Sequence, residues 1–493
     1  MSKRNRRSLA EDLVFPTLLF MALGGMTWAV RGCSGYGGSS GCIFAGVTWG
    51  AAWWFISRNA GREQSRPYSS GWIVLAMTVG IGFAGSRGWA QWPNFFEGHL
   101  STNAQANEFV PISRAYGFLW LFIAGMPWAG LGAGLLAWCS SQSRLRGWEW
   151  LLRVACVIGG GLSGWYLFVR LPEVFLPLYK SIPERYHDLK ANPSLGRLIN
   201  DNRSAITHLG LYLGFLAFEV FRRDWRNVRL ILTVGVVSGL GWALFQNWKW
   251  AEHWWPDARF NFWRCWESSG GLSIGLAYGL AFFLANGRLS PEELAQREIH
   301  LAPRLSRGEW LTVYLGLLLV SVLFLLGEMG LWGIPSFVIL AGFGGAYYLR
   351  FAKEPILPRG EPSLERFGLY IGLLLGLGLS IRNGVKGWFN IYVGNEDYWS
   401  AVLWWIAGPL FLVGFIVLAL NALMRPHPNN CEGEVFPHAY GLLWLVLITQ
   451  NILAQLVTGP LTNWGEVVFS IYYVLLFALS AVIIHHYRVQ QTC

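Results

Sequence analysis

The chain has 493 residues, of which 54% are hydrophobic and only 13% are charged. Because soluble domains carry about 25% charged residues, this composition excludes an ordinary soluble protein and favours an integral membrane protein. The net charge of +10 does not indicate a nucleic-acid partner. The basic residues lie in short loops between apolar runs, where the positive-inside rule accounts for them.

The apolar runs predict the fold class. The first run, 12–31, follows a basic segment, 1–11, and lacks a small-residue cleavage site, so we expect a retained first helix rather than a signal peptide. Runs of about 17–25 residues, long enough to cross a bilayer core, recur to residue 485. They predict an all-α polytopic bundle forming one transmembrane domain, 12–485, followed by a tail, 486–493. The expected spans, about fourteen, are 12–31, 36–57, 70–87, 114–139, 150–171, 205–221, 228–246, 265–286, 309–327, 332–349, 367–383, 399–424, 438–457 and 464–485.

The distribution of Lys and Arg predicts the orientation of these spans. With the N-terminus inside, the inside segments carry 24 Lys and Arg and the outside segments carry 14. Six of those 14 lie in 170–204, a long outer stretch, and long loops weigh little in the rule. We therefore expect both termini to lie in the cytoplasm. The membrane that fits this pattern is a bacterial-type cytoplasmic membrane. The long outer loops are then 88–113, 172–204, 247–264 and 384–398.

A Gly-rich helix with a polar outer end recurs along the chain. Gly80-Ile81-Gly82 leads to Arg87, Gly239-Leu240-Gly241 leads to Gln246-Asn247, and Gly376-Leu377-Gly378 leads to Arg382-Asn383. These copies are four spans apart, a period that keeps the orientation and would make the repeats parallel. Gly-rich helices also align by chance, so the four-helix repeat is one of two open interpretations.

The outer helix ends hold the candidate substrate-binding residues. Arg binds carboxylate or phosphate through a planar fork, and Trp offers a flat surface to rings or acyl chains. This chemistry suits a small anionic or amphiphilic solute. The same residue types also cap helix ends and anchor them among membrane lipids, and that structural interpretation stays open. The candidates are Arg31, Arg87, Gln246, Asn247, Lys249, Trp250, Arg264, Trp266, Arg382, Asn383 and Trp388.

Three further residues are candidates for proton transfer. Glu267 opens the span 265–286 and could act as a coupling residue or, in an enzyme, as a general base assisted by His253. Its structural alternative is a carboxylate that stabilises a helix N-terminus. Glu328, on the outer side of the span 309–327, is a second coupling candidate.

Two function classes remain after the motif search. The chain has no P-loop, no metal-ligand spacing and no CxxC among its seven cysteines, so we expect no cofactor and no metal. The first hypothesis is a transporter of an anionic organic or amphiphilic solute, such as an acidic sugar or a lipid-linked sugar. The second is a membrane-embedded transferase or hydrolase acting on a lipid-linked substrate at the outer leaflet. The sequence leaves the oligomeric state open.

Overall fold

The computed structural model describes residues 9–33, 39–57, 66–85, 92–140, 145–245, 247–258, 260–290, 292–293, 443–444, 447–448, 450–451, 454–455 and 463–489. The expected spans 309–327, 332–349, 367–383 and 399–424 lie outside the described residues, as does most of 438–457. The substrate-binding candidates Arg87, Gln246, Arg382, Asn383 and Trp388, the coupling candidate Glu328 and the expected loop 384–398 also lie outside them.

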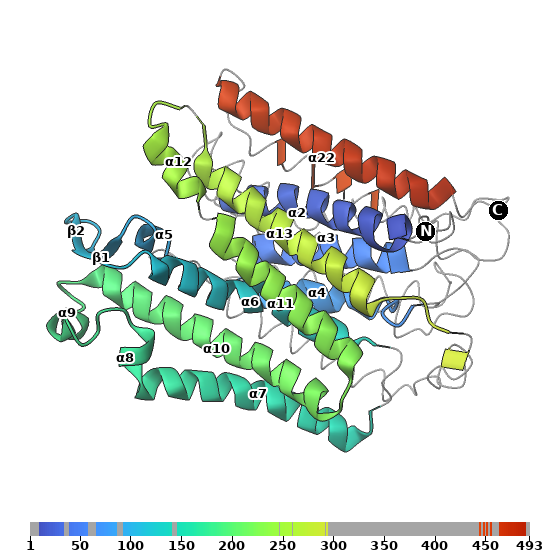
Figure 1. The fold of residues 1–493 in the computed structure, drawn as a ribbon, viewed down its shortest axis with the longest axis horizontal. Coiled ribbons are helices and arrows are strands. Elements are labelled where there is room, and N and C mark those ends of the chain that lie inside the picture. Colours follow the sequence, from blue (N-terminus) through green and yellow to red (C-terminus); the bar gives the residue numbers. More distant parts are fainter. Residues whose placement is uncertain are drawn as a thin grey trace, which may run out of the picture.

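The described residues form mainly long apolar helices (Figure 1). Seven of them are long and apolar enough to cross a membrane, and α3 and α4 contain shorter apolar helices. The helical class is therefore confirmed, and the seven candidate spans fit a multi-pass membrane protein. The count of fourteen spans, the topology and the repeats stay predictions. The long helices are α2 (Phe15–Cys33), α3 (Ser39–Ser57), α4 (Trp72–Ala84), α6 (Ala115–Trp138), α7 (Gly147–Arg170), α10 (Pro193–Phe221), α11 (Trp225–Phe245), α13 (Phe262–Ala285) and α22 (Trp464–Val489).

The stretches between the long helices contain short elements of secondary structure. The stretch 88–113 contains an antiparallel hairpin, β1 (His99–Asn103) and β2 (Glu108–Pro111), so the all-α class holds only for the bundle. In 172–204, α10 already begins at Pro193, since proline suits the first helical turn. The remaining short elements are η1 (Ala10–Val14), α5 (Trp92–Phe95), α8 (Pro172–Phe175), α9 (Pro183–His187) and α12 (Trp248–Trp254).

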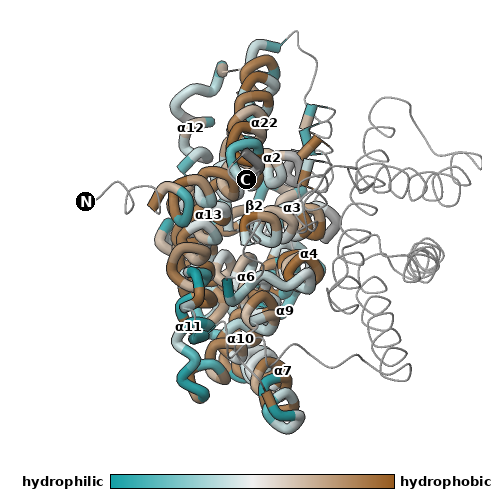
Figure 2. The backbone as a smooth tube through the Cα atoms, turned by 90° about the vertical axis from the view of Figure 1, so that its right-hand side faces the viewer, coloured by the Kyte–Doolittle hydropathy of each residue, from teal (hydrophilic) through white to brown (hydrophobic). Residues whose placement is uncertain are grey.

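The long helices pack side by side in a slab. From one edge to the other, α22 contacts α2, α2 contacts α13 and α3, and α13 contacts α11. Helix α6 contacts α4, α10 and α11, and α10 contacts α7 at the far edge. The end of the slab that carries β1, β2, α8, α9 and α12 is called the hairpin side here (Figure 1). Viewed along the helices, hydrophobic residues predominate within the bundle (Figure 2).

Glycine allows α2 and α13 to pack closely. A Cβ atom on Gly24 would overlap the carbonyl oxygen of Gly271, and a Cβ atom on Gly271 would overlap the carbonyl oxygen of Gly24. In lipid, where the tails are as apolar as the side chains, such close backbone packing is a main source of helix association. These two glycines therefore fix the distance between α2 and α13.

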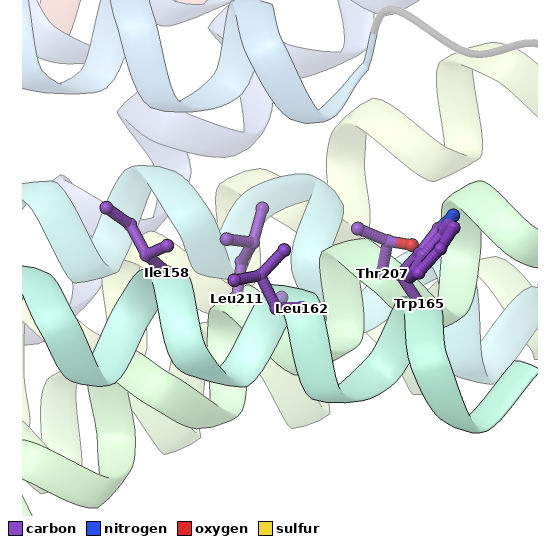
Figure 3. A pocket seen from close by; sticks show the side chains of 6 residues that line it. Ile158, Leu162, Trp165, Thr207 and Leu211 are labelled. Atoms are coloured by element: carbon purple, nitrogen blue, oxygen red, sulfur yellow. The ribbon is translucent and has the colours of Figure 1, made fainter.

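The far edge of the slab carries an open apolar groove. Helices α7 and α10 border it, and it is lined by Ile158, Gly161, Leu162, Trp165, Thr207 and Leu211 (Figure 3).

Candidate functional site

A buried ion pair joins α13 to α22 on the hairpin side. The side-chain oxygen of Asn261 accepts a hydrogen bond from the backbone N–H of Arg264 at 2.9 Å and so caps α13. The guanidinium of Arg264, 4% exposed, donates to the Glu466 carboxylate at 2.5 Å and lies 4.8 Å from the centre of the Phe469 ring. This arginine, a predicted anion binder, is thus neutralised by a carboxylate of the same chain in this conformation.

Glu267 lies in the second turn of α13 rather than at its N-terminus. Because Asn261 provides the cap, the alternative of a terminal capping carboxylate is wrong for Glu267. The residue is 2% exposed. One turn further on, a Cβ atom on Gly270 would overlap the Trp242 ring of α11, and Gly271 abuts Gly24 of α2. Residues three and four apart share a helix face, so Glu267 faces the seam between α11 and α2.

Hydroxyl groups next to Glu267 bind the neighbouring helices. Ser268 Oγ donates to the Gly25 carbonyl of α2 at 3.0 Å and lies 2.7 Å from the Tyr472 hydroxyl of α22. The indole N–H of Trp248 in α12 donates to Ser269 Oγ at 2.9 Å. The turn of α13 that carries Glu267 is therefore held from three sides, by α2, α12 and α22.

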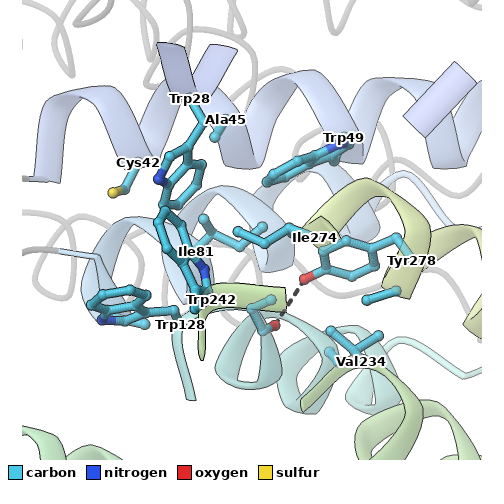
Figure 4. Close-up of a cluster of buried hydrophobic side chains, with 14 of the residues drawn as sticks. Trp28, Cys42, Ala45, Trp49, Ile81, Trp128, Val234, Trp242, Ile274 and Tyr278 are labelled. Carbon is cyan, nitrogen blue, oxygen red and sulfur yellow. Dashed lines mark hydrogen bonds between the residues drawn. The ribbon is translucent and has the colours of Figure 1, made fainter. Parts of the chain in front are cut away.

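Buried aromatic rings from several helices pack against one another in the bundle (Figure 4). The Trp242 ring lies 5.5 Å from Trp266, 5.7 Å from Trp28 and 5.1 Å from Trp128, measured between ring centroids. Trp28 stacks on Trp49 at 6.0 Å. These rings come from α2, α3, α6, α11 and α13 and form one aromatic layer, in which Trp242 packs against Gly270, one turn beyond Glu267 on α13. We call it the tryptophan layer.

The structure brings only part of the predicted set together. Arg264, Trp266 and Glu267 share the first two turns of α13. Trp250 instead donates its indole N–H to the Phe96 carbonyl at 3.1 Å and packs over the loop before β1. Asn247 is the exposed residue that precedes α12. The side chains of Arg31, Lys249 and His253 are outside the described part, although their backbones belong to α2 and α12.

A second buried polar centre lies on the side opposite the hairpin. Arg153 of α7 donates from Nε to Glu219 of α10 at 2.8 Å, and Glu219 also accepts from the Asn227 amide of α11 at 2.9 Å. Tyr68 donates its hydroxyl to Asn227 at 2.5 Å. Burial, followed by the charge of Asp224, raises the pKa of Tyr68 well above its ordinary value. This centre links three helices and the loop before α4.

Sequence reasoning missed this second centre. Arg153 entered only the count of basic residues, and Glu219 was read as part of a span. One signal was present: single residues of opposite charge interrupt two neighbouring apolar runs at similar distances from the same face. Ionisable residues at membrane depth are rarely left unpaired, so each predicts the other as its partner.

Comparison with protein-family models, curated proteins and solved structures found no match to this chain. Within the described residues, no group of three or more His, Cys, Asp or Glu side chains could hold a metal ion. The described residues thus form a helical bundle with several candidate membrane spans and with buried charge towards both of its ends.

Proposed function

We propose that the protein is a membrane carrier for a small anionic or amphiphilic solute, with its binding site on the hairpin side around Arg264 and Glu267. The observation that supports this most directly is the burial of two ionisable side chains, three residues apart, on one membrane-spanning helix. Such groups are costly in a bilayer and by default indicate a solute or proton pathway. In this proposal Arg264 binds the anion and Glu267 couples a proton.

The topology that accompanies this proposal is the one predicted from the sequence. It has fourteen spans, both termini in the cytoplasm and the hairpin side facing outwards, with parallel four-helix repeats as a possible origin. The outward helix ends that carry Arg31, Arg87 and Arg382 would then supply further positive charge at the site. Two single-cysteine variants test the orientation, one with the cysteine at position 106 in the hairpin and one at position 224 before α11. Each is treated with an impermeant thiol reagent.

The carrier proposal is tested by uptake into vesicles that contain the purified protein. The probes are a radiolabelled acidic sugar and a fluorescent lipid-linked sugar phosphate. Arg264→Gln and Glu267→Gln remove charge and keep a polar amide, the second with almost no change in volume. Both should reduce uptake at least tenfold, as should Arg87→Ala and Arg382→Ala. Lys190→Ala, an exposed cation on the same side, is the matched control. Wild-type uptake by all four variants, with normal insertion, would reject the anion site.

One observation favours the second function class. The tryptophan layer lies beside Glu267 in the described bundle, and an enzyme working at one leaflet needs no path through the membrane. In that case Glu267 would act as the general base, with His253 assisting, on a lipid-linked substrate. The same vesicles distinguish the two classes, because a carrier relocates the lipid-linked probe unchanged, whereas a transferase or hydrolase changes its mass.

A further inference from the structure

The groove between α7 and α10 is open to the surroundings of the bundle. It has a volume of about 460 Å³, within the range of small-molecule sites. Gly161 forms part of its floor because it has no side chain, while Ile158, Leu162 and Trp165 rise from α7 as exposed walls (Figure 3). From Ile158 to Trp165 the helix advances about 10 Å. The groove is therefore elongated along α7 and long enough for part of an acyl chain.

If α7 spans a bilayer, its exposed face lies against lipid. Of the candidate spans in the described part, α7 is the least buried, with 22% of its apolar window inside the bundle. Its exposed side chains are hydrophobic along most of its length. Lipid tails are as apolar as these side chains, so a tail alone gains little by entering the groove. A bound lipid must be selected by its headgroup.

Positive charge lies at the hairpin-side end of the groove. Arg203 precedes Thr207 by one helical turn, and the Thr207 hydroxyl donates to the Arg203 carbonyl at 2.8 Å. The Arg203 guanidinium donates to Asn200 at 2.6 Å. A guanidinium has five N–H donors, so this bond leaves donors for a phosphate. Asp201, one acid at this end, is paired with Arg197 at 3.9 Å.

The end of α7 adds the features of a membrane interface. The guanidinium of Arg170 lies 5.3 Å from the centre of the Tyr166 ring, and Trp165 and Tyr166 are both exposed. Trp and Tyr concentrate at the level of lipid headgroups. Arg170 is followed by the exposed Glu173 in α8. Arg203 stands four and eight residues before Thr207 and Leu211 on α10, so it shares the helix face that lines the groove.

We propose that this groove binds one acyl chain of an anionic phospholipid from the hairpin-side leaflet, and that Arg203 binds the lipid phosphate. This site is separate from the one around Glu267 and does not depend on the carrier proposal. The groove supplies the shape for the tail, and the charge on Arg203 supplies the preference for an anionic headgroup.

The test uses the full-length protein in detergent micelles with added phosphatidylglycerol or phosphatidylcholine. Native mass spectrometry counts the bound lipids. The wild-type protein should retain phosphatidylglycerol at least tenfold better than phosphatidylcholine. Arg203→Ala should abolish this preference, and Thr207→Phe, which places a ring in the groove, should reduce retention of both lipids. Arg197→Ala, an exposed cation on another face of the same helix, should behave as the wild type.

Four results would overturn the proposal. The first is equal retention of the two lipids by the wild-type protein, and the second is unchanged preference in Arg203→Ala. The third is efficient disulfide crosslinking between two copies through Ile158→Cys in phosphatidylglycerol vesicles, because it would mean that a second copy covers the groove. Binding of glycerol phosphate as tightly as of the lipid would likewise exclude a role for the acyl chain. Circular dichroism of Thr207→Phe separates loss of the groove from loss of the fold.

Discussion

Replacement of Glu219 by leucine should destabilise the protein far more than its position near a helix end suggests. The carboxylate accepts from Arg153 through Nε at 2.8 Å and Nη2 at 2.5 Å, and from Asn227 at 2.9 Å. The Arg153 side chain also lies 5.0 Å from the Trp150 ring and 5.4 Å from the Trp138 ring, measured from Cζ to the centroids. In Glu219→Leu these rings would surround a guanidinium without its counter-ion.

The expected loss follows from the burial of the pair. The side chains of Arg153 and Glu219 are 1% and 2% exposed, and removal of one partner from such a pair costs about 3–5 kcal/mol. Asn227 adds little, because its amide also donates to Asp224 at 3.1 Å. Removal of both charges in Arg153→Met/Glu219→Leu leaves no unpaired ion, so the double variant should lie within about 1 kcal/mol of the wild type.

Unfolding of the purified protein by titration with SDS, followed by circular dichroism, measures these free energies. The matched control is Arg222→Ala, which breaks the Arg222–Glu149 ion pair between the end of α10 and α7. Its side chains are 26% and 19% exposed, so the expected loss is about 0–1 kcal/mol. The reasoning would be refuted by a loss below about 1 kcal/mol in Glu219→Leu, or by a double variant no more stable than that single variant.

Three further outcomes are expected. Gly271→Leu should lower the unfolding temperature strongly because it forces α2 away from α13, whereas Gly159→Ala, which meets nothing within 4 Å, should leave it unchanged; equal shifts would contradict the packing argument. If the protein is a carrier, Glu466→Gln should lower the KM for an anionic probe, because the carboxylate no longer competes for Arg264; a raised KM would exclude this competition. Above pH about 10, unfolded tyrosine ionises while buried Tyr68, whose pKa is raised, stays neutral, so stability falls as pH rises. Tyr68→Phe should lose less stability than the wild type between pH about 9 and about 11, and an identical loss would contradict this assignment.

Prediction from the sequence succeeded where the length and hydrophobicity of one segment decide its secondary structure. The apolar runs at 114–139 and 265–286 became α6 and α13 because a run of that length in lipid satisfies its backbone only as a helix. The hairpin in 88–113 was missed, since its strands carry no long alternation of apolar residues. The start of α13 was misplaced by a few residues because Asn261, the true cap, stands inside a stretch that reads as loop.

The candidate site was also predictable only in part. Composition and spacing identified Arg264 and Glu267 as unusual, because a charge near an apolar run is visible in one dimension. Their partners were not visible. Glu466 lies 202 residues from Arg264 along the chain, and Trp250 turned towards Phe96 rather than towards α13.

By itself, the sequence determined the helical class, the approximate positions of the long described helices and the concentration of charged and aromatic residues near helix ends. These features depend on hydrophobicity and length, which each segment carries alone. Only the tertiary structure decided which charges pair, that Glu267 lies beside the tryptophan layer, and that α7 presents a groove beside Arg203. These features depend on which helices pack against each other. Glycines such as Gly24 and Gly271 contribute to that arrangement because they allow close backbone contact.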